Sequence, residues 1–247
     1  MKLIVHILLL LIALAPGCLL AKPLRVGVSF AIPPYVIEGE KRGIELDLLT
    51  QAFTGTQYQL QFEFLPLERT FRMFKSGKLD AIINVKPGMM DSRFLTQPVI
   101  TFHNRVFTLY DHPVTTLDEL RHLRVTSFQR AKVILGEDFA TMVSQNPRYE
   151  EVAKQQGQVH LLLRGRVDAI VLEERVFYYY LDQLITHPHS GERYQRAQIN
   201  QADLFPPTIY HFAFRSPDTR ELFDRQLAAM KQDGRYRKVF ETYGATP

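Results

Sequence analysis

The spacing of hydrophobic and polar residues in the first third of the chain predicts a regular succession of strands and helices. Alternation at residues 24–29 and 58–65 predicts two strands, because successive side chains of a strand point to opposite faces. Helical spacing at residues 44–53 and 67–74 predicts two helices. The apolar run at residues 81–85 predicts a third strand. This order is typical of an α/β fold with a mostly parallel sheet.

One short segment occurs twice in similar form. SGKLDAII at residues 76–83 resembles RGRVDAIV at residues 164–171. In each copy a helix ends on glycine, which readily takes the left-handed cap conformation, and a short turn then leads into an apolar strand. We interpret Asp80 and Asp168 as turn and cap residues. Two copies predict two sheets, and therefore two lobes of similar design.

The rest of the chain shows the same two kinds of spacing. It predicts strands at residues 123–128 and 210–214 and helices at residues 131–143, 176–185 and 217–230. No low-complexity linker separates these elements, so strand-like crossings near residues 101–110 and 202–210 are expected to join the lobes. The predicted division is a signal peptide at residues 1–21, a first lobe at 22–105, a second lobe at 106–205 and a return to the first lobe at 206–247.

The N-terminus has the pattern of a secretory leader, with Lys2, an apolar stretch at residues 3–15 and small residues after it. A membrane helix needs about 20 apolar residues, although an uncleaved anchor remains an alternative. We expect cleavage after Ala21 and a periplasmic protein. Lipid attachment at Cys18 is the second alternative. Cleavage removes the only cysteine, so the mature chain forms no disulfide.

Charge and motif spacing exclude several functions. The formal net charge is +4, and basic and acidic residues are interspersed, which argues against nucleic-acid binding. The eight histidines show no His-x-x-x-His pair, and His187 and His189 flank a proline in a predicted loop. There is no Gly-x-Ser-x-Gly motif. We therefore expect no catalytic residues, no metal and no cofactor. We also expect a monomer.

Candidate binding residues follow the two repeated strands. Ligands of open parallel sheets bind beyond the carboxyl ends of the strands. Asn84 and, further on, Arg93 follow the first repeated strand, and Glu173 ends the second. Arginine holds a carboxylate through paired hydrogen bonds, while an acid takes an ammonium group. One such group on each lobe predicts a clamp for a zwitterion.

Five stretches, in order along the chain, resemble bacterial extracellular solute-binding proteins of family 3, which serve polar amino-acid ABC transporters. The stretches are LRVGVSFAIPPYVIEGEKRGIELDLL, SGKLDAIINVKPGMMDSR, LDELRHLRVTSFQ, LLLRGRVDAIVLEE and LAAMKQDGRYRKVFETYG. The resemblance implies a type II periplasmic-binding fold whose first lobe contains both chain ends. It also implies capture of a small amino-acid-like or carboxylate ligand by lobe closure, for an ABC importer or a sensor.

The resemblance assigns roles to both ends of the clamp. It places Arg93 where the family keeps its carboxylate-binding arginine, and Glu173 where many members keep an aspartate for the ammonium group. Each has a structural alternative. Arg93 is otherwise a surface arginine near the start of a helix, and Glu173 is otherwise a helix cap, since acids at strand ends commonly have that role.

Further cleft residues follow from the same resemblance. Phe30 and Tyr35 lie in the loop that contributes an aromatic wall, and Leu67 and Arg69 lie at the cleft-facing start of a helix. Arg69 has an alternative role as an ion-pair partner of Glu68 or Glu45. Gln129 begins a Gln-Arg-Ala turn where amino-acid binders often have Gly-Thr-Thr. This departure weakens the prediction that the ligand is a standard amino acid.

Two rival functions remain beside ligand capture. Exported dehydratases of the cyclohexadienyl or arogenate type resemble this family, and Glu173 would then act as a general acid. In the second rival, the cleft is degenerate and the protein acts only through protein contacts. We expect a binding protein and not an enzyme.

Overall fold

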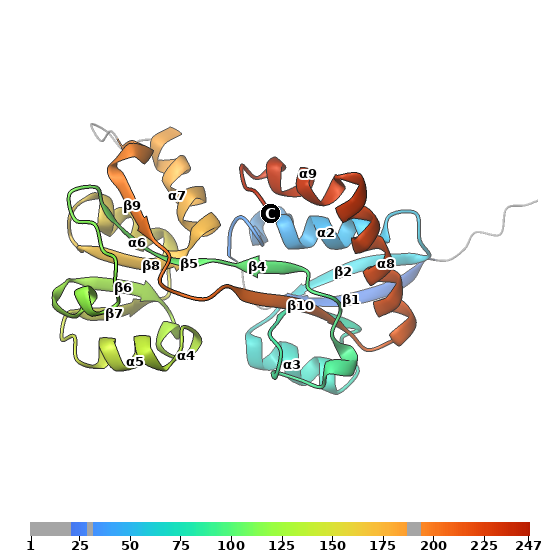
Figure 1. Cartoon of the computed structure of the whole chain (residues 1–247). Helices are drawn as coiled ribbons and strands as arrows, with labels where there is room; N and C mark the ends of the chain where they lie inside the picture. Colours follow the sequence, from blue (N-terminus) through green and yellow to red (C-terminus); the bar gives the residue numbers. More distant parts are fainter. Residues whose placement is uncertain (1–20, 29–31, 187–193) are drawn as a thin grey trace, which may run out of the picture.

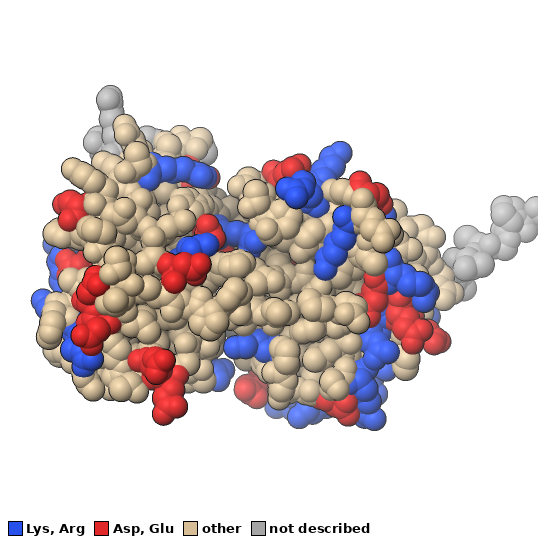
Figure 2. Space-filling model, viewed as in Figure 1, with Lys and Arg blue, Asp and Glu red and all other residues tan. Residues whose placement is uncertain are grey.

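The computed structural model describes residues 21–28, 32–186 and 194–247. These residues form two α/β lobes joined by two passages of the chain (Figure 1). The predicted leader up to residue 20, including Cys18, lies outside the described residues, as do Phe30 and the predicted loop that contains His187 and His189. The space-filling view narrows between the lobes and carries charges of both signs on its visible face (Figure 2).

The first lobe is built on a five-stranded sheet with the order β2-β1-β3-β10-β4. Its strands are β1 Lys22–Val28, β2 Tyr58–Phe64, β3 Ala81–Val85, β4 Ile100–Phe102 and β10 Thr208–Phe214. Helices α2, α8 and α9 cover one face, and α3 covers the other (Figure 1). Their bounds are α2 Ile44–Phe53, α3 Leu67–Lys75, α8 Pro217–Asp233 and α9 Arg235–Thr242, with short 3-10 helices at Glu38–Glu40 and Ser92–Phe94.

The second lobe repeats this design with the strand order β7-β6-β8-β5-β9. Its strands are β5 Asn104–Leu109, β6 Val125–Phe128, β7 Tyr149–Val152, β8 Ala169–Glu173 and β9 Ile199–Ala202. Helices α6 and α7 lie on one face, with α4 and α5 on the other (Figure 1). Their bounds are α4 Ala131–Ile134, α5 Glu137–Ser144, α6 Gln155–Leu163 and α7 Glu174–Thr186, with 3-10 helices at Asp118–His122 and Arg196–Gln198.

In each sheet four strands run in one direction and one runs against them. The opposed strand is β10 in the first lobe and β5 in the second, and each follows directly on a passage from the other lobe. The first passage is only His103, between β4 and β5, and the second is residues 203–207. The mostly parallel sheets agree with prediction. The division of the lobes at residues 105 and 205 stays a proposal. Pairing in the second sheet already begins one residue before the first boundary, where Asn104 pairs with Glu173.

The repeated segment has equivalent contacts in both lobes. The carboxylate of Asp80 accepts hydrogen bonds from the backbone N–H of Arg25 and from its Nε, both at 2.9 Å. Asp168 accepts from the backbone N–H of Arg124 at 2.7 Å and from its Nε at 3.1 Å. Each aspartate therefore ties the turn before a central strand to the neighbouring strand, at the middle of β1 for Asp80 and just before β6 for Asp168, which is a structural role.

One predicted helix is wrong as a single element. Residues 131–143 form two helices, α4 and α5, because Gly136 between them has a φ of 100°. This left-handed backbone, which glycine adopts freely, interrupts the helical hydrogen bonding and redirects the chain.

Gly43, at the start of α2, is required by a close backbone approach. Its φ is 135°, and a Cβ atom built on it would lie 2.3 Å from the carbonyl oxygen of Tyr35. The backbone N–H of Glu45 donates to that same oxygen at 3.1 Å. Helix α2 therefore holds the loop that carries Tyr35, and only glycine fits at the point of contact.

Replacing Gly43 with alanine is expected to lower the free energy of unfolding by about 2–4 kcal/mol, the combined effect of backbone strain and overpacking. Gly39→Ala is the matched control, because no heavy atom lies within 4 Å of a Cβ at that position. It should change stability by less than about 0.5 kcal/mol. Urea unfolding of both variants measures the difference, and equal stabilities would contradict the argument.

Candidate functional site

A cavity of about 480 Å³ lies between the two lobes. It sits at the carboxyl ends of β3, β6, β7 and β8, where open parallel sheets bind ligands. The first lobe contributes Ile32, Asn84, Phe102 and Tyr210. The second lobe contributes Asn104, Phe128, Gln129, Arg130, Ile134, Ala153, Lys154, Gln155, Gln156, Glu173 and Tyr180.

Three of the predicted site residues come together in this cavity, namely Asn84, Gln129 and Glu173. Tyr35 is fully buried and stacks on Phe102 of the cavity wall, with ring centroids 4.3 Å apart. Phe30 lies outside the described residues. The structure thus brings three of the predicted residues to one cavity and places Tyr35 behind its wall.

The other predicted residues do not belong to the described lining. The side chain of Arg93 is 72% exposed, pairs with Asp91 at 3.3 Å and lies over the ring of Phe94. Leu67 and Arg69 begin α3, and Arg69 forms no ion pair with a described acid. Arg93 is therefore not positioned in this structure to hold the carboxylate of a ligand in the cavity.

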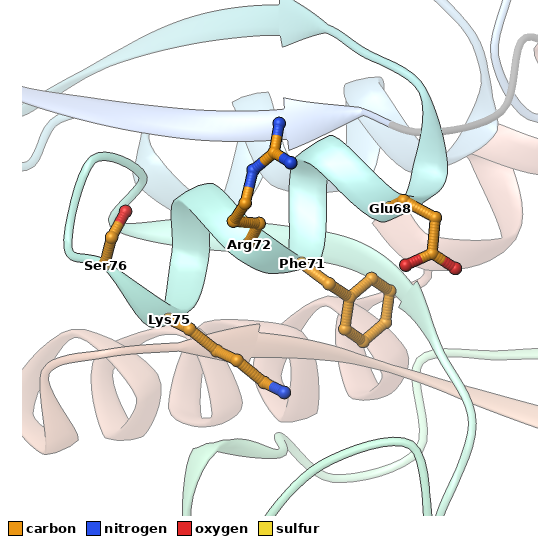
Figure 3. Close-up of a pocket in the computed structure, with 5 residues that line it drawn as sticks. All are labelled: Glu68, Phe71, Arg72, Lys75 and Ser76. Carbon is orange, nitrogen blue, oxygen red and sulfur yellow. The ribbon is translucent and has the colours of Figure 1, made fainter.

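A second hollow of about 490 Å³ lies on the outer side of α3. Figure 3 shows that its described lining follows this one helix and the residue that caps it. The lining is Glu68, Phe71, Arg72, Lys75 and Ser76. Because one helix alone provides these groups, they cannot enclose a ligand from two sides, and the cavity between the lobes is the better candidate site.

Glu173 is 4% exposed, and both its oxygens accept hydrogen bonds within the protein. Oε2 accepts the backbone N–H groups of Arg175 at 2.8 Å and Val176 at 3.1 Å, which caps the start of α7. Oε1 accepts the backbone N–H of His103 at 3.3 Å. The structural alternative for Glu173, a helix cap, is thus present in the structure.

Arg175 connects this carboxylate to the first lobe. Its Nη1 donates to Glu173 at 3.3 Å, to the hydroxyl of Tyr35 at 3.1 Å and to the carbonyl of Thr101 at 2.9 Å. Its Nε donates to the carbonyl of Thr246 at 2.7 Å. We call these five residues the junction network. It joins α7 of the second lobe to three separate segments of the first.

Burial dominates the electrostatics of the junction network. It raises the pKa of Glu173, and the charge of Arg175 opposes this effect. Burial also raises the pKa of Tyr35 well above its usual value, and the negative charge of Glu173 adds to the rise. The guanidinium therefore neutralises a carboxylate that has little access to water.

A second buried carboxyl group lies behind the cavity. Asn84 lines the cavity and donates from Nδ2 to Oε2 of Glu45 at 2.9 Å. Both side chains are at least 95% buried, and neither Oε1 of Glu45 nor Oδ1 of Asn84 has a partner among the described residues. Burial raises the pKa of Glu45 to about 8. Glu45 is therefore mostly protonated at neutral pH.

The shape of β3 places Asn84 at the cavity. The pairing register between β3 and β10 shifts by one residue between the pairs Val85–His211 and Ile82–Ala213. Such a bulge turns a side chain away from the regular alternation of the strand. Asn84 also has a φ of 59°, a left-handed value that asparagine tolerates better than most residues.

The backbone N–H groups of the turn that begins with Gln129 bind a carboxylate of the protein itself. Glu151 on β7 accepts the backbone N–H of Arg130 at 2.8 Å and that of Lys132 at 3.1 Å. Burial acts to raise the pKa of Glu151, but these two bonds, together with the Tyr149 hydroxyl and the charge of Lys132, outweigh it and the pKa is lowered. An internal carboxylate thus already occupies the N–H groups at the start of α4.

The described ranges contain neither a candidate metal cluster nor a helix that could span a membrane. Within residues 21–28, 32–186 and 194–247, no group of three histidine, cysteine, aspartate or glutamate side chains is arranged to hold a metal ion. Across the same ranges, no helix is both long enough and apolar enough to cross a membrane.

A family model described as bacterial extracellular solute-binding proteins, family 3, matches residues 24–246. No curated protein matches the sequence. The match covers nearly all of the described chain and agrees with the family that the sequence resembles.

Three solved structures illustrate the likeness of fold. A histidine kinase sensor domain with similarity to periplasmic binding proteins has a TM-score of 0.67 at 18% identity, covering 92% of this chain and 99% of its own. An L-arginine-bound amino acid ABC transporter substrate-binding protein from Streptococcus pneumoniae has a TM-score of 0.63 at 19% identity, covering 90% and 94%. An ancestral amino acid-binding protein, a precursor of cyclohexadienyl dehydratase, has a TM-score of 0.63 at 18% identity, covering 90% and 95%. The shared fold is the predicted type II periplasmic-binding fold.

The Arg175→Ala substitution is expected to lower the free energy of unfolding by about 3–5 kcal/mol, because it leaves the Glu173 carboxylate buried without its counter-charge. The double variant Glu173→Gln, Arg175→Met removes both charges and should recover part of this loss. Arg196→Ala is the control, since Arg196 pairs with Asp182 on the surface and such pairs contribute about 1 kcal/mol or less. Denaturant unfolding that finds Arg175→Ala no worse than Arg196→Ala would contradict the role of the junction network.

The stability of the protein is expected to fall as pH rises from about 5 to about 8. The pKa of Glu45 rises from 4.5 to about 8 on folding, so the folded state keeps a proton that the unfolded chain releases in this window. The free energy of unfolding then decreases by up to about 1.4 kcal/mol per pH unit. In Glu45→Gln this contribution is absent, so the stability of the variant relative to the wild type should increase as pH rises. Melting curves between about pH 5 and 9 test this.

The control for Glu45→Gln is Glu68→Gln, an exposed position on α3. Its melting temperature should follow that of the wild type at every pH. A Glu45→Gln variant whose melting temperature also runs parallel to the wild type would show that Glu45 does not retain the proton.

Proposed function

The chain belongs to the bacterial extracellular solute-binding proteins, family 3, and on this premise we propose that it captures a small amino-acid-like or carboxylate solute between its lobes. Lobe closure around the solute is a hinge motion, which changes the surface that a partner meets. The partner is the permease of an ABC importer or the sensor domain of a signalling protein.

The cavity between the lobes is the observation that carries this proposal. Both lobes contribute to it, and it combines apolar walls such as Phe102 and Phe128 with buried polar groups such as Asn84 and Asn104. Small-molecule sites commonly have this composition and a volume of about 300–1,000 Å³. The two passages of the chain, one of them a single residue, favour rotation of one lobe against the other.

We place the mature protein in the periplasm as a monomer. The family is extracellular, and the sequence begins with the pattern of a secretory leader. Cleavage after Ala21 is the first alternative for processing and lipid attachment at Cys18 is the second.

We propose binding without catalysis. Glu173 is the acid that a dehydratase mechanism would use, and its oxygens accept backbone N–H groups while its charge faces Arg175. A general acid must present a proton to the substrate. A carboxylate committed to a helix cap and an ion pair fits a structural role better.

A thermal-shift screen over amino acids, opines, polyamines and small carboxylates is expected to find a saturable ligand. At about 100 times its dissociation constant, a ligand adds about 2.7 kcal/mol of stability, which raises the melting temperature of a chain of this size by about 5–10 °C. Gln129→Trp narrows the cavity and should reduce the shift. Lys75→Trp, in the hollow on α3, should leave it unchanged. The same screen on Arg93→Ala tests whether Arg93 contributes to binding, as the predicted clamp requires.

Three outcomes would contradict the proposal. If no compound stabilises the protein, the cleft is degenerate and the protein acts through protein contacts alone. If Lys75→Trp abolishes the shift while Gln129→Trp does not, the site is on α3. If prephenate or arogenate is converted to product and Glu173→Gln loses this turnover, the protein is an enzyme.

A further inference from the structure

The charged groups that would hold an amino acid in the cavity are already engaged within the protein. The carboxylate of Glu173, which would take an ammonium group, faces Arg175 at 3.3 Å. Glu45, the next acid behind the wall, is mostly protonated at neutral pH because its pKa is about 8. Glu151 is bound to the backbone N–H groups at the start of α4. The described lining therefore offers no uncommitted carboxylate to an ammonium group.

Positive charge is available in the cavity where β6 and β7 end. Phe128 of β6 pairs in register with Val152 of β7, and the two strands are parallel. Arg130 and Lys154 each lie two residues beyond this pair, so they leave adjacent strands at the same edge of the sheet. Both line the cavity, and neither side chain forms an ion pair or hydrogen bond with a described residue.

The first turn of α6 adds to this positive wall. Gln155 and Gln156 line the cavity, and no side chain caps the helix at Lys154. The first N–H groups of a helix lack partners within it and attract negative charge. The second lobe thus presents two cationic side chains and a helix N-terminus to the same space.

Other parts of the lining present neutral polar groups. Asn84 and Asn104 are each only 5% exposed and line the cavity, and Oδ1 of Asn84 has no partner among the described residues. A buried carbonyl oxygen without a partner costs free energy unless a ligand or water donates to it. These two amides suit a hydroxyl or amide group of a solute rather than a second charge.

We propose that the solute is a small organic carboxylate without an ammonium group, held through its carboxylate by Arg130 and Lys154, with a neutral donor directed at Asn84. Arginine and lysine form charge-assisted hydrogen bonds with carboxylates. The carboxylate then lies against the second lobe, away from Arg93. This inference rests on the proposed function, because it specifies the solute of the same cavity.

Matched pairs of compounds that differ only at the amino position test the class of solute. The probes are L-malate against L-aspartate, L-2-hydroxyglutarate against L-glutamate, and L-lactate against L-alanine, measured by isothermal titration calorimetry on the full mature chain. The member without an ammonium group is expected to bind at least about tenfold more tightly in the pair of the right length, since an ammonium group in the cavity lacks a counter-charge.

Charge-removing variants of similar length test the residues. Arg130→Gln and Lys154→Gln are each expected to weaken binding of the preferred carboxylate by about tenfold to a hundredfold. Both side chains are exposed, so the fold should persist, and far-UV circular dichroism checks it. Lys132→Gln is the matched control, because it removes a neighbouring positive charge outside the described lining. Lys132→Gln and Arg93→Ala should both bind as the wild type does.

The outcomes separate this inference from the proposed function. If an amino acid binds more tightly than its partner compound, or if Arg93→Ala loses binding while Arg130→Gln and Lys154→Gln retain it, the inference is wrong and solute capture stands. If no probe in these pairs and no compound of the wider screen binds, both are wrong.

Discussion

The ion pair between Glu173 and Arg175 is the interaction on which the junction of the two lobes depends. A buried carboxylate is costly unless a counter-charge and hydrogen bonds compensate it, and here Arg175 supplies the charge while α7 and His103 supply N–H groups. The same guanidinium also binds Tyr35 and the carbonyl of Thr246. The pair thus fixes the start of α7 and ties it to both ends of the first lobe's sequence.

This constraint shapes the cavity beside it. Because Glu173 is neutralised internally, the recognition groups left free are the buried amides of Asn84 and Asn104 and the cations Arg130 and Lys154. The fold is common to a family, but the cavity of this chain therefore has its own arrangement of polar and charged groups. The fold sets the position of the cavity, and the local ion pairs set which of its charged side chains remain free.

Local patterns made the fold predictable, whereas the partners in the site depend on distant residues. The repeated segments around Asp80 and Asp168 were enough to infer two lobes. β7 was missed because Tyr149–Val152 is short and has two acids at its centre. Without β7, nothing marks Lys154 as a residue just beyond the end of a strand. The role of Arg175 depends on Tyr35, 140 residues away, and on Thr246, 71 residues away. No local pattern reports such contacts.

The single-residue passage at His103 has a mechanical consequence. When one lobe rotates about this point, residues close to His103 move little. Glu173 is one of them, because its Oε1 accepts the His103 N–H, whereas strands far from β5 move more. In the order β7-β6-β8-β5-β9, Arg130 follows β6 and Lys154 follows β7. If the lobes rotate about His103, Glu173 stays nearly still, while Arg130 and Lys154, which follow strands two and three places from β5, move further relative to the first lobe.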